Sequence, residues 1–171
     1  MDSRCEFLEG GDIVQGFAPV NLATAANTGD YVSLVNAEKV IVHFVSGVGT
    51  AGDDPVISLY QAKDASGTGA KALNFTKVRH KVGATALSAV GQWTTASQSA
   101  ESSYDTDGID GAENECQLAI EITPDMLDGA NNFTHIRADI ADVGSNAQIG
   151  YLEYIVAGRS YKRSTPNSVI A

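Results

Sequence analysis

Charged side chains are scarce in this 171-residue sequence, and cations are the scarcer kind. Charged residues make up 19% of the chain, with 11 Lys and Arg against 21 Asp and Glu, so the formal net charge is −10. A protein that neutralises phosphates needs a basic surface, so we expect no direct nucleic-acid partner. The low charge and the 17 glycines also disfavour a long charged helix and favour short strands joined by turns.

Cysteine is scarce too, and no apolar run approaches a membrane-spanning length. The two cysteines, Cys5 and Cys116, cannot build a disulfide framework, and we expect two free thiols. A transmembrane helix would need about 18 apolar residues in a row. The residues that follow Met1 are polar and do not resemble a signal peptide. We therefore expect a protein made in a reducing cytoplasm, without a membrane partner.

Motifs for catalysis, metals and cofactors are missing as well. The histidines, His43, His80 and His135, lie in separate predicted strands without the local pairs that zinc sites use. The acidic run Asp105–Gly111 differs from a calcium loop, because its third acid is displaced by one position and no bidentate Glu follows. Neither a GxSxG nucleophile elbow nor a GK[ST] phosphate loop is present. The sequence therefore predicts no enzyme, no cofactor and no metal site.

The chain is instead rich in β-strand patterns, most clearly in residues 36–63. The segment Glu38–Val45 is apolar on both faces, which is typical of a strand covered on both sides. A Gly-rich and then acidic connection leads to a second strand, Pro55–Ala62, and favours a hairpin-type link. We expect this strand pair to form the centre of the domain.

Alternating patterns predict the other strands. Glu115–Ile122 is the clearest of them, with every second residue apolar. Further strands are expected at residues 13–20, 30–35, 73–81, 85–97, 133–141 and 147–157. Thr123 and Pro124 predict one short helical turn. Many turn signals and little helix favour an all-β antiparallel β-sandwich or jelly roll of about eight strands, with a barrel as the alternative.

The chain is expected to fold as one domain with extended ends. Residues 1–29 are predicted to be an N-terminal arm with at most one short strand. Residues 30–157 form the β-sandwich domain, and residues 158–171 a polar C-terminal tail. The acidic loop at residues 101–113 is long enough to carry a function. The basic strand at residues 73–81 is expected at a sheet edge or an interface.

The remaining functional candidates are surface residues near the C-terminal end of the chain. Aromatic and Arg side chains often anchor interfaces, and the tail combines a basic group with an apolar ending. The candidate interface residues are Tyr151, Tyr154, Arg159, Tyr161, Lys162, Arg163, Val169 and Ile170. Half-buried sheet positions explain the first two tyrosines equally well. A frayed terminus explains the tail as well as docking on a neighbouring chain does.

Two runs of the sequence resemble small structural proteins of tailed bacteriophages, often encoded among the head genes. They are Gly49–Ala62, followed by Gly67–Leu73, and Ile136–Gln148; the resemblance extends from about Gly16 to the tail. Among virion proteins, the chain is most similar to capsid decoration, or cement, proteins. The resemblance implies a homotrimer on the capsid surface of the virion that bridges subunits of the major capsid protein and has no catalytic residues.

Two alternatives stay open at this point. One is a tail or head–tail connector component of the virion, which is also β-rich. The other is a carbohydrate-binding host-recognition module, which would need exposed aromatic side chains on one face. The aromatic residues Trp93, Tyr104 and Tyr60 are scattered in the sequence and do not decide this question.

Overall fold

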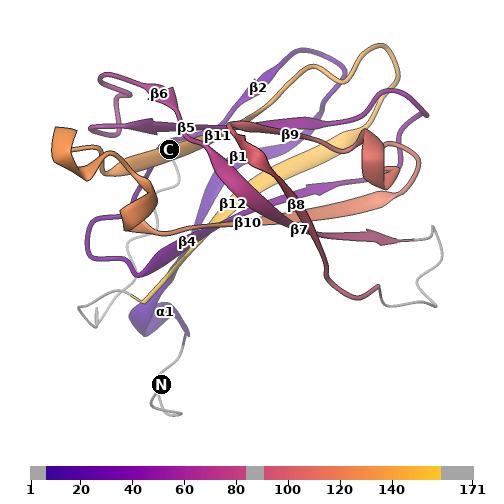
Figure 1. Ribbon diagram of the computed structural model, residues 1–171. Helices are drawn as coiled ribbons and strands as arrows, with labels where there is room; N and C mark the ends of the chain where they lie inside the picture. Colours follow the sequence, from indigo (N-terminus) through magenta and orange to yellow (C-terminus); the bar gives the residue numbers. More distant parts are fainter. Residues whose placement is uncertain (1–6, 84–90, 159–171) are drawn as a thin grey trace.

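The fold consists of two antiparallel β-sheets packed face to face (Figure 1). Side chains alternate along each strand, so each sheet has one apolar face, and these two faces pack together. The computed structural model describes residues 7–83 and 91–158. Sheet A has the order β1 (Asp12–Asn21), β12 (Ile149–Ala157), β4 (Lys39–Ser46), β10 (Glu115–Ile122), β7 (Phe75–Gly83) and β8 (Thr94–Glu101). Sheet B contains β2 (Asn27–Thr28), β11 (His135–Ile140), β5 (Val56–Ala62) and β6 (Lys71–Ala72), with β3 (Val32–Ser33) on β11 and β9 (Ser103–Asp105) on β5.

Helical segments are short and lie between or before the strands. They are α1 (Phe7–Gly10) and three 3₁₀ turns, η1 (Asp107–Ile109), η2 (Pro124–Met126) and η3 (Gly129–Asn131). The turn predicted at Thr123 and Pro124 is therefore confirmed as η2, with Pro124 at its first position. No helix in the described part of the chain is long and apolar enough to cross a lipid bilayer.

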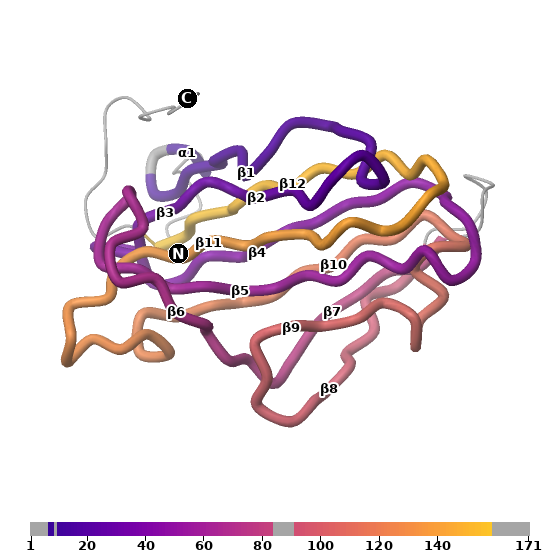
Figure 2. Tube along the Cα trace, turned by 90° about the horizontal axis from the view of Figure 1, so that it is seen from above, coloured from indigo at the N-terminus to yellow at the C-terminus, as the bar shows by residue number. Residues whose placement is uncertain are grey.

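The core lies between the sheets and is almost entirely apolar. In β4, Val40, Val42 and Phe44 have no exposed surface, and Ile57 and Leu59 of β5 are equally buried. Each such side chain stabilises the fold by about 1.5–3 kcal/mol relative to its exposed state. Figure 2 shows sheet B in front of sheet A, with β11 and β5 running over β4 and β10. The all-β prediction is confirmed, whereas the jelly-roll assignment stays a prediction.

One polar contact inside the core joins the two sheets. Tyr154 of β12 is fully buried, and its hydroxyl accepts a hydrogen bond from the backbone N–H of Ala138 in β11, at 2.9 Å. Burial raises the pKa of this hydroxyl far above its ordinary value, so it stays protonated. A buried polar group needs a partner, and here each sheet supplies one of the two.

The central strand pair is present, but it is not a hairpin. β4 lies inside sheet A and pairs with β10 and β12, whereas β5 lies inside sheet B and pairs with β11. The prediction of a hairpin-type link is therefore wrong. Because the inner faces of both strands are apolar, they pack against the opposite layers, and the Gly-rich connection carries the chain from one sheet to the other.

The N-terminal boundary predicted at residue 30 is also wrong. β1 pairs with β12 from Asp12 opposite Val156 to Asn21 opposite Ile149, and Leu22 is fully buried in the core. Register shifts within β1 accommodate the Gly and Pro residues that made this segment look like an arm. At Gly16 a Cβ atom would lie 2.6 Å from Leu152, so this strand needs a glycine to approach β12.

Three further predictions change in detail. The acidic loop predicted at residues 101–113 contains β9, which pairs with β5 from Val56 to Ser58. The basic strand β7 is not a sheet edge, because β10 and β8 flank it on both sides. The strand predicted at residues 85–97 is observed from Thr94 onward as β8, and residues 84–90 lie outside the described part of the chain.

Candidate interaction surface

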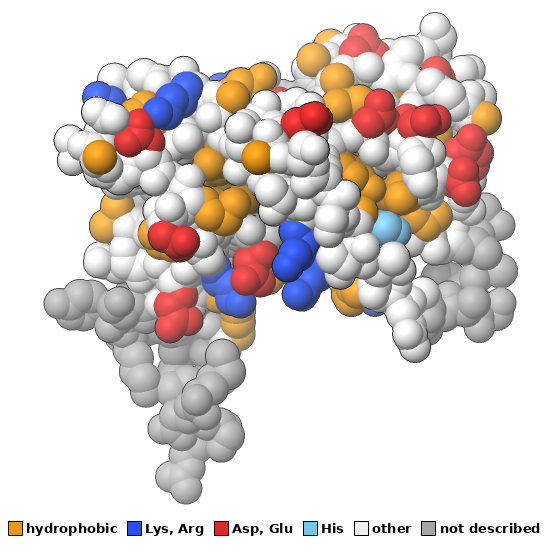
Figure 3. Space-filling model, viewed as in Figure 1, with side chains coloured by type: hydrophobic (Ala, Val, Ile, Leu, Met, Phe, Trp, Pro, Cys, Tyr) orange, Lys and Arg blue, Asp and Glu red, His pale blue; other side chains and the backbone are white. Residues whose placement is uncertain are grey.

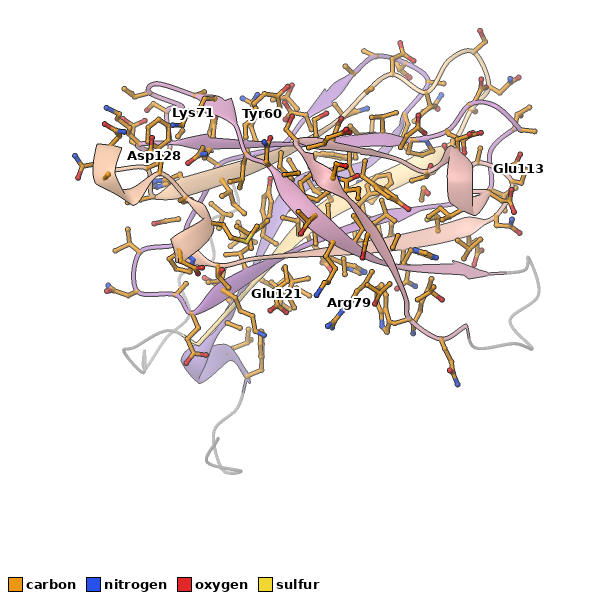
Figure 4. All side chains as sticks on the ribbon, in the orientation of Figure 1. Tyr60, Lys71, Arg79, Glu113, Glu121 and Asp128 are labelled. Carbon is orange, nitrogen blue, oxygen red and sulfur yellow. The ribbon has the colours of Figure 1, made fainter. Side chains whose placement is uncertain are left out.

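The outer face of sheet A, called here the sheet A face, is the side of that sheet that points away from sheet B. In β4 it carries Ile41, His43 and Val45, which alternate with the buried core residues of that strand. Neighbouring strands contribute Tyr151 of β12, which lies opposite Val45, and Arg79 of β7, which is level with His43. In Figure 4, Arg79 and Glu121 lie on this lower side of the sandwich, opposite Tyr60, Lys71 and Asp128.

A row of three isoleucines crosses the sheet A face. Ile13 of β1 lies opposite Ile155 of β12, and Ile155 lies opposite Ile41 of β4. The side chain at the edge, Ile13, is 51% exposed, and the other two are partly buried by their neighbours. Val45 and Tyr151 form a second apolar pair four residues along the same strands. Adjacent apolar side chains on an open sheet face are typical of a surface that binds another protein.

Charged side chains next to this row differ in whether they have partners. His43 and Glu153 face each other across the strands, with Nδ1 and Oε1 2.8 Å apart. Lys39 forms an ion pair with Glu121 at 3.2 Å. Lys77 and Arg79 of β7 form no ion pair with a described residue. These two cations on an acidic protein are therefore available to carboxylates of a partner.

A cavity of about 300 Å³ opens at the end of the sheet A face where β7 and β10 separate. The last paired residues of these strands are Ala119 and Arg79, after which β7 continues along β8 and β10 along β4. The cavity is lined by Ile41, Phe75, Ala119 and Met126 together with Lys77, Arg79 and Glu121. Its apolar floor and charged rim fit a partner segment that carries both apolar and acidic side chains. In Figure 3, blue and red side chains lie close together at the lower middle of the molecule, with orange side chains next to them.

The outer face of sheet B, called here the sheet B face, pairs its charges internally. The Arg137 guanidinium lies 5.0 Å from the ring centre of Tyr31 and 5.1 Å from that of Tyr60. It also donates a hydrogen bond to Asp139 at 2.8 Å. These contacts occupy the Arg137 guanidinium, which would otherwise be available to a binding partner.

A second cation on the same side of the sandwich, Lys71, is also held by contacts within the chain. Lys71 forms an ion pair with Asp128 and lies 4.4 Å from the ring centre of Phe133. The hydrogen bond from Lys71 lowers the pKa of the Asp128 carboxyl below its ordinary value. The charged side chains Arg137 and Lys71 of the sheet B face are therefore engaged in contacts within the chain.

The acidic loops gather at one end of the sandwich. Burial raises the pKa of the Asp54 carboxyl, the hydrogen bond from the Ala112 N–H opposes this, and the nearby Glu113 and Asp107 carboxylates add to the rise. Within residues 7–83 and 91–158 no group of three His, Cys, Asp or Glu side chains is placed to hold a metal ion. The absence of a metal or cofactor in the protein stays a prediction.

The structure separates the two tyrosines predicted as interface anchors. Tyr151 lies partly exposed on the sheet A face, whereas Tyr154 has no exposed surface. The interface role of Tyr154 is therefore wrong. Side chains alternate between the two faces along a strand, so Tyr154, three residues from Tyr151, points into the core. The other candidates lie outside the described residues: Arg159, Tyr161, Lys162, Arg163, Val169 and Ile170.

Of the two cysteines, only Cys116 lies in the described part of the chain. Cys116 is a buried free thiol, and burial raises its pKa to about 12, which makes it unreactive. The free-thiol prediction is confirmed for this residue, and Cys5 lies outside the described residues.

Sequence reasoning missed the isoleucine row and the position of the two cations beside it. The basic alternation of residues 73–81 was a signal for Lys77 and Arg79, and the interface alternative predicted for that strand is compatible with their position. No sequence signal could place Ile13, Ile41 and Ile155 together, because they lie far apart in the chain and meet only through the strand register.

Comparisons with known proteins give a structural likeness without a family. No protein-family model and no curated protein matches the chain. Among solved structures, the chain is similar to that of the SPBc2 prophage-derived protein YomS, with 14% sequence identity and a TM-score of 0.43. The match covers 85% of this chain and 91% of YomS. This level of similarity does not transfer a function.

Proposed function

We propose that this chain is a structural protein of a tailed-bacteriophage virion that decorates the outside of the capsid. In this role it binds the major capsid protein, self-associates as a homotrimer, and stabilises the shell by bridging subunits. The observation that supports a binding role is the sheet A face, where an isoleucine row adjoins a cavity and two cations that form no ion pair with a described residue. The phage assignment itself rests on the sequence resemblance of Gly49–Ala62, Gly67–Leu73 and Ile136–Gln148 to virion proteins.

The physical requirements of a cement protein agree with these features. Such a protein acts by burying surface across several subunits, and a stable interface of that kind covers about 1,200–2,000 Å² in total. A rigid sandwich with one half-apolar face supplies such a surface without any chemical step. The net charge of −10 also keeps an external protein from competing for packaged DNA.

The sheet B face gives the carbohydrate-binding alternative no support. Sugar rings stack on uncovered aromatic faces, whereas Arg137 lies over both Tyr31 and Tyr60. Trp93 is 43% exposed, but Lys81 lies 5.1 Å from its ring centre.

Binding to capsids tests the proposal directly. Purified protein is mixed with mature capsids of the encoding phage from which this gene has been deleted, and the pellet is analysed after sedimentation. We expect saturable binding, added density at regular positions over the shell, and a higher capsid melting temperature. Binding confined to one vertex or to the tail would contradict decoration and favour the connector alternative.

A further inference from the structure

The sequence of residues 1–9 matches the cavity of the sheet A face in chemistry. This segment contains the acids Asp2, Glu6 and Glu9 against a single cation, Arg4. It also contains Phe7 and Leu8, which are 48% and 43% exposed in α1. Exposed large apolar side chains flanked by acids fit a cavity with an apolar floor whose rim carries the cations Lys77 and Arg79, while Glu121 on the same rim is paired with Lys39.

We infer that residues 1–9 of one copy bind the cavity between β7 and β10 of a second copy, with Phe7 and Leu8 on its apolar floor and the acidic side chains at Lys77 and Arg79. The inference deepens the proposed function, since it rests on the self-association included there. It names the surface and the segment through which the copies would associate.

The position of α1 favours a second copy over the same chain. The Phe7 ring packs against Gly11, the residue before β1, where a Cβ atom would lie 2.8 Å from the ring. β1 is one edge of sheet A, while the cavity lies on the far side of β12 and β4. Figure 1 shows α1 hanging below that edge, on the same side as the sheet A face.

The isoleucine row connects the donor and the acceptor surfaces. Ile13 follows α1 closely in the chain, and the row passes through Ile155 to Ile41, which itself lines the cavity. A docked copy would cover this row as well as fill the cavity, so apolar burial and charge pairing would act together. Because the donor segment and the acceptor cavity are different surfaces, repeated contacts of this kind close into a ring when the rotation permits.

Charge reversal with compensation tests the inference. Sedimentation equilibrium is run over a range of concentrations on the full chain, on the acceptor variant K77E/R79E, and on the donor variant D2K/E6K. We expect each reversal to raise the dissociation constant of self-association about tenfold or more. The variant that combines all four substitutions should restore self-association, because the opposite charges face each other again.

A matched control reverses two cations on the other side of the sandwich. K63E/K71E changes the net charge by the same amount as K77E/R79E, and it should leave self-association unchanged. Thermal melting of each variant confirms that it is folded. A wild-type chain that stays monomeric, an oligomer that ignores the acceptor reversal, or a fourfold variant that remains dissociated would each overturn the inference.

Capsid sedimentation of the same variants separates this inference from the proposed function. If the wild-type chain binds capsids but its self-association ignores the reversals, the inference fails and decoration stands. If charge reversal and compensation behave as expected while no variant binds capsids, decoration fails and the docking contact stands. If the segment docks in its own chain, the protein is monomeric with a protected segment, which also overturns the inference.

Discussion

The two outer faces of this sandwich differ in where their charged side chains find partners. On the sheet B face, Arg137 pairs with Asp139 and two tyrosine rings, and Lys71 pairs with Asp128 and Phe133. On the sheet A face, Lys77 and Arg79 have no such ion pair among the described residues and adjoin an apolar row and a cavity. A face whose charges are paired internally gains little from a partner, whereas one with unpaired cations next to apolar surface gains both burial and ion pairs.

The largest expected effect is the loss of partner binding when the isoleucine row is interrupted. Ile155→Arg places a charge between Ile13 and Ile41, and we expect it to weaken self-association or capsid binding by about 2–4 kcal/mol. Because this side chain points outward, the fold should tolerate the change. The control, Ser58→Arg, lies in the middle of β5 on the sheet B face. Titration by sedimentation measures both variants, and equal losses would remove the distinction between the faces.

A change in the core should affect stability and leave the distinction between the faces intact. Tyr154→Phe removes the acceptor of the Ala138 N–H and leaves that buried donor unpaired. We expect the free energy of unfolding to fall by about 1–3 kcal/mol. Urea denaturation measures this loss. Partner binding at a temperature well below the melting point should be unchanged, and a parallel loss of binding would show that the sheet A face depends on this contact.

Two arginines provide a crossed test of the faces. Arg137→Ala removes a guanidinium held between two rings, and we expect the fold to lose about 1 kcal/mol of stability without a change in partner binding. Arg79→Ala removes a cation that has no ion-pair partner in the described part of the chain, and we expect weaker binding with stability changed by about 0.5 kcal/mol or less. Thermal melting and sedimentation on both variants give four values. The comparison is contradicted if Arg79 proves to be the stabilising arginine.

The smallest expected effect is a pH dependence that both sheets share. Burial lowers the pKa of His80 in β7 and of His135 in β11 below the ordinary 6.5, although the Asp64 carboxylate partly opposes the shift at His135. The unfolded chain therefore takes up protons near pH 6.5 before the folded chain does, so stability decreases as the pH falls below that value. Melting temperatures between pH 7.5 and 5 measure the slope. His80→Gln and His135→Gln should each reduce it, and an unchanged slope in both variants would assign it to other groups.

The alternation of the sequence predicted most of the strands but not their arrangement. Glu115–Ile122 is a strand with the predicted bounds, and its inward residues are those that the pattern indicated. The burial of Tyr154 could not be predicted from the sequence pattern, because an aromatic side chain suits an interface and a core equally well. Its burial depends on which face of β12 meets β11, and that is a property of the packed sheets rather than of the local pattern.

The sequence by itself determined that this protein folds as an all-β domain, because a period of two in apolar residues specifies strands with one buried face. It also determined the acidic charge and the scarcity of cations. Only the tertiary structure decided that β4 and β5 lie in opposite sheets, that β1 belongs to the sandwich, and that three distant isoleucines form one row beside Lys77 and Arg79. The reason is physical: the pattern within a strand sets the face of each side chain, while hydrogen bonding between strands sets its neighbours.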